Sequence, residues 1–423
     1  MTADTIFALS SGSPPAAIAV VRISGPRADA ALEVLTGRLP EPRRASVAKL
    51  LWGGEQLDEA LVLRFPGPAS ATGEDIAELH LHGGRAVVAA VLAALGDMEG
   101  CRAAEPGEFT RRAFENGRFD LAEAEGLADL LQAETETQRR AAQALAGGAL
   151  SRLTGGWQLR LLQLAAALEA VLDFSDEGEV GEEWPAGWSE GVATLADEMR
   201  AALARPAAER LRDGLRVVIA GPPNAGKSSL LNWLAGRQAA ITSAIAGTTR
   251  DLVEAPTAIG GTPFLLVDTA GLRDSDDEVE AMGVGRARDS MAAADLILWL
   301  GPPEDAPDRS ILVQSKIDLG GPARAADVRT SAETGEGMDA LVALLIARAR
   351  DLLPGDGEVA LNARHRSAIA LAEEQLREAA EAHDLLISAE CLRQARVALD
   401  RVTGRAGIED MLDTLFGRFC IGK

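Results

Sequence analysis

A glycine-rich stretch in the middle of the chain has the spacing of a phosphate-binding loop. Gly221, Gly226, Lys227 and Ser228 match the pattern G-x-x-x-x-G-K-[S/T], between an apolar run that favours a strand and a run that favours a helix. Glycines allow the backbone N–H groups to face a phosphate, and the start of the following helix favours an anion. We expect the Lys227 ammonium to bind the β- and γ-phosphate oxygens and the Ser228 hydroxyl to bind Mg²⁺.

Two segments further along have the order of the switches of a GTPase. The segment DTAG, residues 268–271, follows an apolar run, so Asp268 can reach the magnesium shell through water and Gly271 can donate its N–H to the γ-phosphate. Before it, Thr248 or Thr249 in the segment AGTTRD is expected to close over Mg²⁺. Such a segment is ordered by the γ-phosphate and released after hydrolysis.

The segment SKID, residues 315–318, predicts a loop that binds guanine. The Asp318 carboxylate can accept from both guanine N–H groups, which adenine does not offer, so the segment favours GTP over ATP. GTPases commonly have Asn at the position of Ser315, and we expect the shorter side chain to weaken the contact with the base. The segment SAETGEG, residues 331–337, supplies a further loop toward the base.

The sequence leaves open which residue activates the attacking water. Many GTPases have Gln after the DTAG glycine, but this chain has Leu272, which cannot orient water. The amide oxygen of Asn224 can bind a monovalent cation, which would neutralise charge where an arginine finger otherwise acts. Arg250 and Arg273 are candidates for an arginine finger, or they form ion pairs with nearby acids. The segment LRDSDDEVE, residues 272–280, is rich in acids, and either one of them holds the attacking water or the segment is a solvated loop. The five acids are Asp274, Asp276, Asp277, Glu278 and Glu280.

The hydrophobic pattern predicts a multidomain fold with α+β and α/β parts. Residues 1–118 mix short β-like runs with an Ala-rich helix between Gly and Pro breaks, which indicates an α+β domain. Residues 119–210 and 355–423 have the apolar spacing of helices. From 211 to 354 strands alternate with helices, which predicts a parallel sheet covered on both faces and inserted into the helical domain.

Composition and charge exclude several classes of protein. The chain has 423 residues and a formal net charge of −22, from 42 basic and 64 acidic side chains. This charge excludes a protein that coats nucleic acid through bulk attraction, but it leaves open an RNA met through a local patch or a partner. The three cysteines lie far apart, which fits a reducing cytoplasm. No apolar stretch approaches the roughly 20 residues that span a bilayer, so we expect a cytoplasmic protein.

Two histidines could suggest a metal site. His80 and His82 lie two residues apart in a run that favours a strand, so they share a face. Because the sequence places no Cys or acid partner nearby, a packed or half-exposed pair is expected instead.

The chain resembles the MnmE (TrmE) family of tRNA-modifying GTPases over essentially its full length. The motifs GPPNAGKSSLLN, AGTTRD and DTAGLR…DEVE belong to the nucleotide-binding part, and many GTPases share such motifs. The segments TGEDIAELHLHGG, EPGEFTRRAFENGRFDLAEAEGLADL and the final CIGK make the resemblance specific. It implies a homodimer through N-terminal folate-binding domains, a helical domain and an inserted GTPase domain.

The resemblance also implies a site for K⁺-stimulated hydrolysis of GTP. The implied K⁺ ligands are Asn224, Ser243, Ile245 and Thr248. Ser228 and Thr249 are the implied Mg²⁺ ligands, and Glu280 is the acid that orients the attacking water. The full set of implied GTP contacts is Asn224, Ala225, Gly226, Lys227, Ser228, Ser229, Ser243, Ala244, Ile245, Ala246, Gly247, Thr248, Thr249, Asp268, Thr269, Ala270, Gly271, Ser315, Lys316, Asp318, Ser331 and Ala332.

Substrate and partners follow from the same resemblance. The implied partner is a flavoprotein of the MnmG (GidA) type, which binds FAD and NADH and forms a heterotetramer with this chain. Together they would install an aminomethyl-type group at C5 of the wobble uridine of certain tRNAs. A tetrahydrofolate derivative of the 5-formyl or 5,10-methylene type would supply the carbon. The implied folate contacts are Arg22, Glu78, Arg118 and Lys423, which offer a carboxylate for the pterin N–H groups and cations for the glutamate tail.

The chain ends in FCIGK, which has the outline of a C-a-a-X prenylation box. Lys423 at the last position and Gly422 at an aliphatic position disfavour prenylation. With the resemblance, the tail is expected to lie across the folate pocket and to supply Cys420 as an active-site thiol. The alternative function is a regulatory GTPase switch in ribosome assembly or stress, without substrate chemistry. The predicted folate site and the terminal thiol favour the enzyme.

Overall fold

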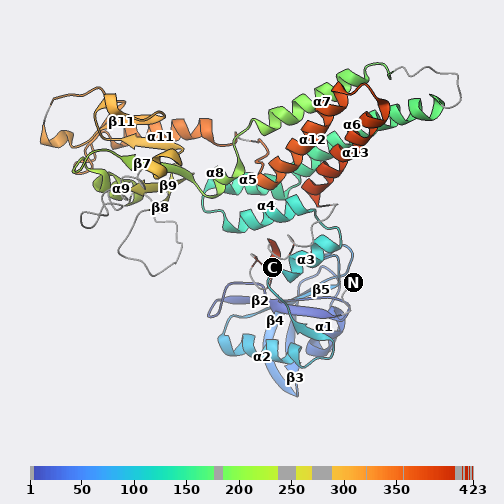
Figure 1. Ribbon diagram of the computed structural model, residues 1–423. Coiled ribbons are helices and arrows are strands. Elements are labelled where there is room, and N and C mark those ends of the chain that lie inside the picture. The colour runs from blue at the N-terminus through green and yellow to red at the C-terminus, as the bar shows by residue number, and fades with distance from the viewer. Residues whose placement is uncertain are drawn as a thin grey trace, which may run out of the picture. The chain divides into compact units, whose positions relative to one another are not determined.

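The computed structural model describes residues 4–175, 184–236, 254–268, 288–320, 322–355, 357–404, 412, 415–417, 419 and 422. It contains two compact units (Figure 1): Met1–Ala128 with Thr403–Lys423, here the N-terminal unit, and Asp129–Val402, here the second unit. The domain boundaries predicted from the sequence do not coincide with this division and stay a prediction. Among the described residues, no helix is long and apolar enough to cross a membrane.

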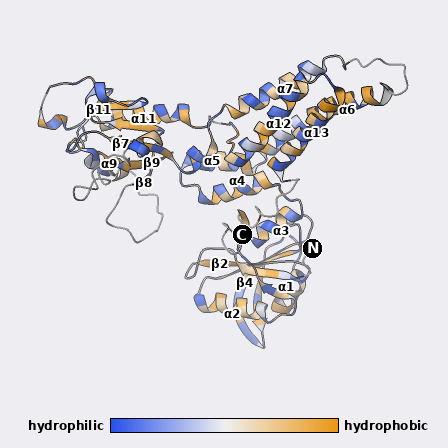
Figure 2. Ribbon diagram, viewed as in Figure 1, coloured by the Kyte–Doolittle hydropathy of each residue, from blue (hydrophilic) through white to orange (hydrophobic). Residues whose placement is uncertain are grey.

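The N-terminal unit contains a six-stranded sheet in the order β3-β4-β5-β2-β1-β6. Its strands are β1 (Thr5–Leu9), β2 (Ile18–Ser24), β3 (Ser46–Trp52), β4 (Glu55–Phe65), β5 (Ile76–His82) and β6 (Cys101–Ala103). Neighbouring strands are antiparallel, except that β1 and β6 are parallel. Figure 2 shows hydrophobic residues along the strands near β2 and β4, where apolar runs predicted strands. The prediction of an α+β part is confirmed.

One face of this sheet is covered by two helices. Side chains alternate along each strand, so Phe7, Val21 and Leu79 point to the same face and are buried there. Helices α1 (Ala28–Thr36) and α2 (Arg85–Gly96) contribute buried Leu and Val side chains to that core. Burial of this apolar surface is the main stabilising contribution to the unit.

The other face, which we call the open face, is only partly covered. Helix α3 (Glu108–Glu115) packs Phe109 against two strand residues at one end. Elsewhere three apolar side chains remain accessible, with Ile18 59%, Val47 61% and Leu61 38% exposed. An apolar surface of this kind commonly marks a binding site or an interface.

A buried arginine on α3 ties three segments of the N-terminal unit together. The Arg112 side chain is 3% exposed and forms ion pairs with Asp4 at 3.0 Å, with Glu108 at 2.9 Å and with Glu74 at 3.3 Å. Ser24 of β2 also donates to Glu74, at 2.8 Å. The start of β1, the loop before β5 and α3 are therefore fixed to one guanidinium.

The described residues of the C-terminal tail pack against the same unit. Leu412, Leu415, Phe416 and Phe419 are buried in one cluster with residues of α4 (Leu121–Gln132). Gly107, which precedes α3, has a φ of +69°, and a Cβ there would lie 2.1 Å from the Phe416 carbonyl oxygen. Only glycine fits such a close backbone contact.

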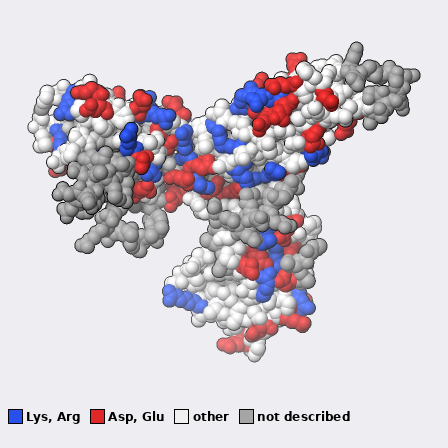
Figure 3. All heavy atoms as spheres, in the orientation of Figure 1, with Lys and Arg blue, Asp and Glu red and all other residues white. Residues whose placement is uncertain are grey.

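The second unit contains a group of helices and a second sheet. The helices are α5 (Glu136–Ala146), α6 (Ala149–Ser175), α7 (Trp188–Leu203), α8 (Ala208–Arg212), α12 (Ala363–Glu381) and α13 (Leu385–Thr403), with the last residues of α4 and α13 at the division. The Trp188 indole donates to the Leu164 carbonyl at 3.0 Å, which joins α7 to α6. Arg200 of α7 pairs with Glu373 of α12 at 2.6 Å. On the face drawn in Figure 3, basic and acidic side chains lie next to each other over the region of α7.

The second sheet has the strand order β12-β11-β10-β7-β9-β8. Its strands are β7 (Leu215–Ala220), β8 (Glu254–Ile259), β9 (Thr262–Asp268), β10 (Leu296–Trp299), β11 (Ser310–Gln314) and β12 (Val328–Arg329). Val217 and Ile219 are buried in one cluster, to which α9 (Lys227–Gly236) and α11 (Met338–Leu352) contribute, and Val218 is buried in another. Both faces of β7 are therefore covered, as the α/β prediction requires.

One strand of this sheet departs from the predicted parallel arrangement. β8 runs antiparallel to β9, while the other neighbours are parallel. Gly260 and Gly261, with φ of +58° and +78°, join the two strands directly. A two-residue turn of this kind forms a hairpin, whereas a parallel pair needs a long crossover.

The chain enters and leaves the second sheet through two segments that lie side by side. Ala207 pairs with Leu361, and the Ala208 N–H donates to the Leu361 carbonyl at 3.0 Å. On α5, Thr137 Oγ1 donates to the Gly261 carbonyl at 2.8 Å. These contacts fasten the sheet to the helices within the second unit.

We predict that Arg112→Met lowers the free energy of unfolding of the N-terminal unit by about 1–3 kcal/mol, because it removes the buried guanidinium to which three half-buried carboxylates are hydrogen-bonded. Hydrogen exchange of the β1 and β5 amides in the full chain measures this loss. The matched control is Arg111→Met, since Arg111 pairs with Glu115 at the surface and such pairs contribute about 0–1 kcal/mol. Equal effects of the two substitutions would contradict the role given to Arg112.

Candidate functional site

The predicted phosphate-binding loop joins β7 to α9. Gly221, Asn224 and Gly226 have φ angles of 145°, 60° and 92°, which are conformations that glycine adopts freely and asparagine tolerates. Lys227 is 6% exposed, and its Nζ donates to the Gly221 and Pro222 carbonyl oxygens at 3.1 and 2.9 Å. The ammonium therefore lies inside the loop, in a position to meet a phosphate.

Ser228 and Asp268 meet at the start of α9 and the end of β9. Ser228 Oγ donates to Asp268 Oδ2 at 2.7 Å, and Asp268 is buried. Hydroxyl and carboxylate oxygens are the ligands that Mg²⁺ prefers in proteins. The two side chains therefore fit the predicted magnesium shell, while Thr249 lies outside the described residues.

A cavity of about 570 Å³ lies beside the phosphate-binding loop, where the guanine base is expected. Asp318 is exposed in the short helix η3 (Ile317–Leu319). Ser331 is fully buried, and its hydroxyl accepts a hydrogen bond from the Thr334 N–H at 3.1 Å. It therefore stabilises the loop that begins at residue 331. The predicted nucleotide contacts that line the cavity are Gly226, Ser229, Ser315, Lys316, Asp318 and Ala332.

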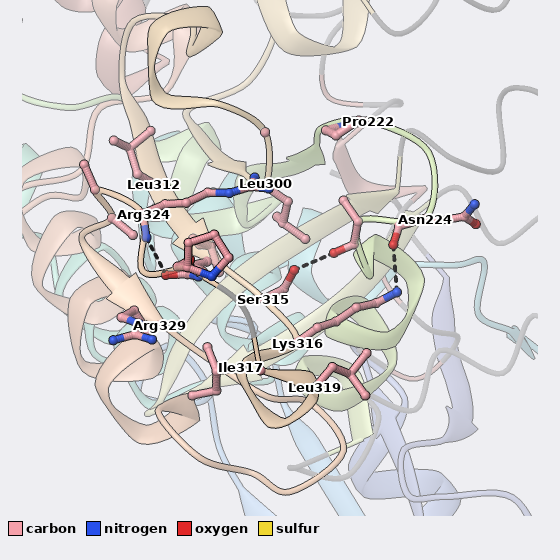
Figure 4. A pocket seen from close by; sticks show the side chains of 18 of the residues that line it. Pro222, Asn224, Leu300, Leu312, Ser315, Lys316, Ile317, Leu319, Arg324 and Arg329 are labelled. Atoms are coloured by element: carbon pink, nitrogen blue, oxygen red, sulfur yellow. Dashed lines mark hydrogen bonds between the residues drawn. The ribbon is translucent and has the colours of Figure 1, made fainter.

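The phosphate-binding loop and the base loop are hydrogen-bonded to each other. Figure 4 shows this contact at an adjoining cavity of about 420 Å³. Ser315 Oγ donates to the Ala225 carbonyl at 2.5 Å, and Lys316 Nζ donates to the Asn224 carbonyl at 2.7 Å. The single Ser315 hydroxyl proton is thus used to hold the loop, and it is not available to a base. This geometry gives a physical reason for the weaker base contact that the sequence predicts.

Several predicted residues lie outside the described residues. These are the switch segments with Ser243, Ala244, Ile245, Ala246, Gly247, Thr248 and Thr249 and with Thr269, Ala270 and Gly271, the finger candidates Arg250 and Arg273, and the acids Asp274, Asp276, Asp277, Glu278 and Glu280. Cys420 and Lys423 of the tail are outside as well. The predictions made for all of these residues stay predictions.

On the open face of the N-terminal sheet the structure brings two predicted folate contacts together. Arg22 of β2 lies opposite Glu78 of β5, and its Nε and Nη2 donate to Glu78 Oε1 at 3.0 and 2.8 Å. The Arg22 guanidinium also lies over the Phe109 ring, 5.9 Å from its centroid. These two hydrogen bonds from Arg22 hold the Glu78 carboxylate in place. The third predicted contact, Arg118, follows α3 beside Gly73, and its side chain is exposed.

The expectation that His80 and His82 lack an acid partner is wrong. His80 Nε2 lies 3.4 Å from Glu78 Oε2, and His82 Nδ1 lies 2.7 Å from Asp58 Oδ1. Glu78 precedes His80 by two residues on the same strand face, so this pairing could have been read from the sequence. Among the described residues, no group of three or more His, Cys, Asp or Glu side chains that could hold a metal ion is present.

Two of the three thiols are in surroundings that disfavour reaction. Burial raises the pKa of the Cys101 thiol, and burial also raises the pKa of the Cys391 thiol. A thiol with a raised pKa stays protonated near neutral pH and is a poor nucleophile. Neither residue is therefore a candidate nucleophile.

The Arg112 cluster is a feature that the sequence reasoning missed. Arg102 forms hydrogen bonds to Asp4 and Glu108 as well. The Arg102 hydrogen bond is the largest cause that lowers the pKa of Asp4. The spacing of Glu108 and Arg112, four residues apart on a helix, was a readable signal for one of the contacts. The pairing of Arg112 with Asp4 and Glu74, which lie in other segments, could not be predicted from the sequence.

The loop between β7 and α9, the acid at the end of β9 and the base cavity beside η3 define a P-loop nucleotide-binding domain of the GTPase type. The family model of the MnmE helical domain matches residues 121–420, and that of the GTP-binding protein TrmE N-terminus matches residues 5–118. The chain belongs to the MnmE family.

Relatives of similar length support this membership. A protein of Erythrobacter litoralis is 60% identical over 99% of this chain and 100% of its own length. A protein of Rhizorhabdus wittichii is 61% identical over 99% of this chain and 97% of its own length. A protein of Novosphingobium aromaticivorans is 56% identical over 99% of this chain and 100% of its own length. Each is named tRNA modification GTPase MnmE.

We predict that Ser315→Asn raises the affinity for GDP about two- to tenfold, because the longer amide can hold the Ala225 carbonyl and also reach the base. Titration with a fluorescent GDP analogue, with competition by ADP, measures the change. The gain is expected for guanine and not for adenine. An unchanged or lower affinity for GDP would contradict the role given to the Ser315 hydroxyl.

Proposed function

We propose that this chain is a K⁺-stimulated GTP hydrolase that modifies C5 of the wobble uridine of certain tRNAs, with a carbon from a tetrahydrofolate derivative. Its family membership makes it a GTP hydrolase of tRNA modification. The observation that carries the finer proposal is a contact of the tail: Ser10 Oγ donates to the Gly422 carbonyl at 2.7 Å. The C-terminal tail is therefore bound to the sheet that carries Arg22 and Glu78.

GTP would bind between the phosphate-binding loop and the cavity beside η3. Lys227 would hold the β- and γ-phosphates, since its ammonium already lies inside the loop. Ser228 and Asp268 would hold Mg²⁺, the first directly and the second through water, and the metal would stabilise the charge that develops on the phosphates. Asp318 would select guanine. K⁺ would bind at Asn224 with Ser243, Ile245 and Thr248, and Glu280 would orient the water.

A pterin would bind on the open face through Glu78. Glu78 Oε1 accepts both hydrogen bonds from Arg22, which fixes the carboxylate. A carboxylate so oriented can accept hydrogen bonds from the N–H groups of a pterin ring. Arg118 and Lys423 are the proposed cations for the negatively charged end of the folate. This chain's residues would hold and orient the folate, which supplies the one-carbon unit.

The open face also suits a second copy of the chain. Ile18, Val47 and Leu61 leave apolar surface exposed on it, and burial of such surface drives association. We therefore place the homodimer contact at the N-terminal domains. A flavoprotein of the MnmG type would supply FAD and NADH in a heterotetramer. Because this chain has a net charge of −22, that partner would carry much of the basic surface for tRNA. The proposed location is the cytoplasm.

We predict that Cys420→Ser abolishes C5 modification of the wobble uridine and leaves GTP hydrolysis within twofold, with hydrolysis faster in KCl than in NaCl for both proteins. Mass spectrometry of tRNA nucleosides from complemented cells and phosphate release in vitro measure the two activities. The matched control is Cys101→Ser, which is expected to retain both. Normal modification with Cys420→Ser would remove the thiol from the reaction. Equal GTP turnover in the two salts would contradict the K⁺ site.

A further inference from the structure

The residue that binds the tail continues the β1 ladder by one position. The Ser10 N–H donates to the Val20 carbonyl at 2.7 Å, so Ser10 lies opposite Val20, just as Ala8 lies opposite Arg22. Because side chains alternate along a strand, the Ser10 side chain falls on the open face, with Arg22 and Glu78. Its hydroxyl donates to the Gly422 carbonyl at 2.7 Å.

Gly422 fits this place because it has no side chain. Its φ is +96°, and a Cβ there would lie 2.1 Å from the Leu9 carbonyl oxygen and 2.9 Å from the Ser10 Cα. Both atoms belong to backbone, which cannot move aside without disturbing β1. The Ser10 hydroxyl and the backbone of Leu9 and Ser10 thus form a shaped seat for the penultimate residue.

Two further contacts hold the tail on its way to this seat. Phe416 and Phe419 are 2% and 4% exposed, and the Phe416 carbonyl lies against Gly107. The tail is therefore anchored at three places within the N-terminal unit. Among the described residues of the tail, Gly422 is the one nearest to the end of the sequence.

We propose that Ser10 is a positioning residue, which holds Gly422 and thereby confines the end of the chain to the open face beside Arg22 and Glu78. Cys420 precedes Gly422 by two residues in the sequence, so the seat would act close to the proposed thiol. Without the seat, the last residues would sample a much larger volume, because a free chain end has little to restrain it. This inference rests on the proposed role of the tail in tRNA modification.

The first test measures the seat without reference to the reaction. The full-length protein is treated with a broad-specificity carboxypeptidase, and the release of C-terminal residues is followed by mass spectrometry. Ser10→Ala is expected to speed release about two- to tenfold, which is the range for the loss of one neutral hydrogen bond. Ser10→Thr keeps the hydroxyl and is expected to restore the slow rate. The matched control is Ser13→Ala, because Ser13 is exposed in the loop that follows Ser10.

The second test measures the consequence for the reaction. Ser10→Ala is expected to lower C5 modification of tRNA at least about twofold, in step with tail release, and Ser10→Thr to recover it. GTP turnover is expected to be equal in all variants. Equal tail release from Ser10→Ala and Ser13→Ala would overturn the seat. Faster release with normal modification would overturn the positioning role.

The two proposals fail in different ways. If Cys420→Ser abolishes modification while Ser10→Ala leaves it normal, only the present inference is overturned. If neither substitution changes modification, the proposed role of the tail is overturned as well.

Discussion

The N-terminal unit depends on one guanidinium shared among three carboxylates. Arg112 is buried, and it pairs with Asp4 before β1, with Glu74 before β5 and with Glu108 on its own helix. A buried charge of this kind is tolerated only when its partners surround it. The cluster therefore fixes α3 relative to the sheet. Because Gly107, directly before α3, receives Phe416 of the tail, the position of the tail depends on the same cluster.

The proposed folate site and the nucleotide site lie in different units. The open face with Arg22, Glu78 and the bound tail belongs to the N-terminal unit, and the phosphate-binding loop belongs to the second unit. In the second unit, Thr137 of α5 contacts Gly261, which lies in the turn between β8 and β9. These two strands connect the predicted switch segments. The Thr137–Gly261 hydrogen bond therefore connects the helices of this unit to the two strands next to the predicted switch segments.

Local features of the fold could be predicted from the sequence, and distant contacts could not. The phosphate-binding loop was predictable because its glycines and Lys227 lie within a few residues between a strand and a helix. The antiparallel β8 was missed, although Gly260 and Gly261 between two short runs are a readable signal of a hairpin.

The same limit applies to the sites. Arg22 and Glu78 are 56 positions apart, and Ser10 and Gly422 are 412 apart, so only the folded structure reveals these pairs. The family resemblance named Arg22 and Glu78 as ligand contacts, but it did not indicate that one orients the other. The Ser315 hydroxyl illustrates the reverse case. The sequence showed Ser315 in place of Asn and predicted a weaker contact with the base, and the structure shows the Ser315 hydroxyl donating to the phosphate-binding loop instead.

The proposed folate site on the open face depends on Glu78. Titration of the full-length protein with 5-formyltetrahydrofolate, followed by calorimetry, tests it most directly. Saturable binding is expected for the wild type, and Glu78→Gln is expected to weaken it at least about tenfold, as the loss of a charged acceptor implies. GDP affinity is expected to be the same in both proteins. Absence of binding to the wild type, or equal binding to Glu78→Gln, would contradict the claim.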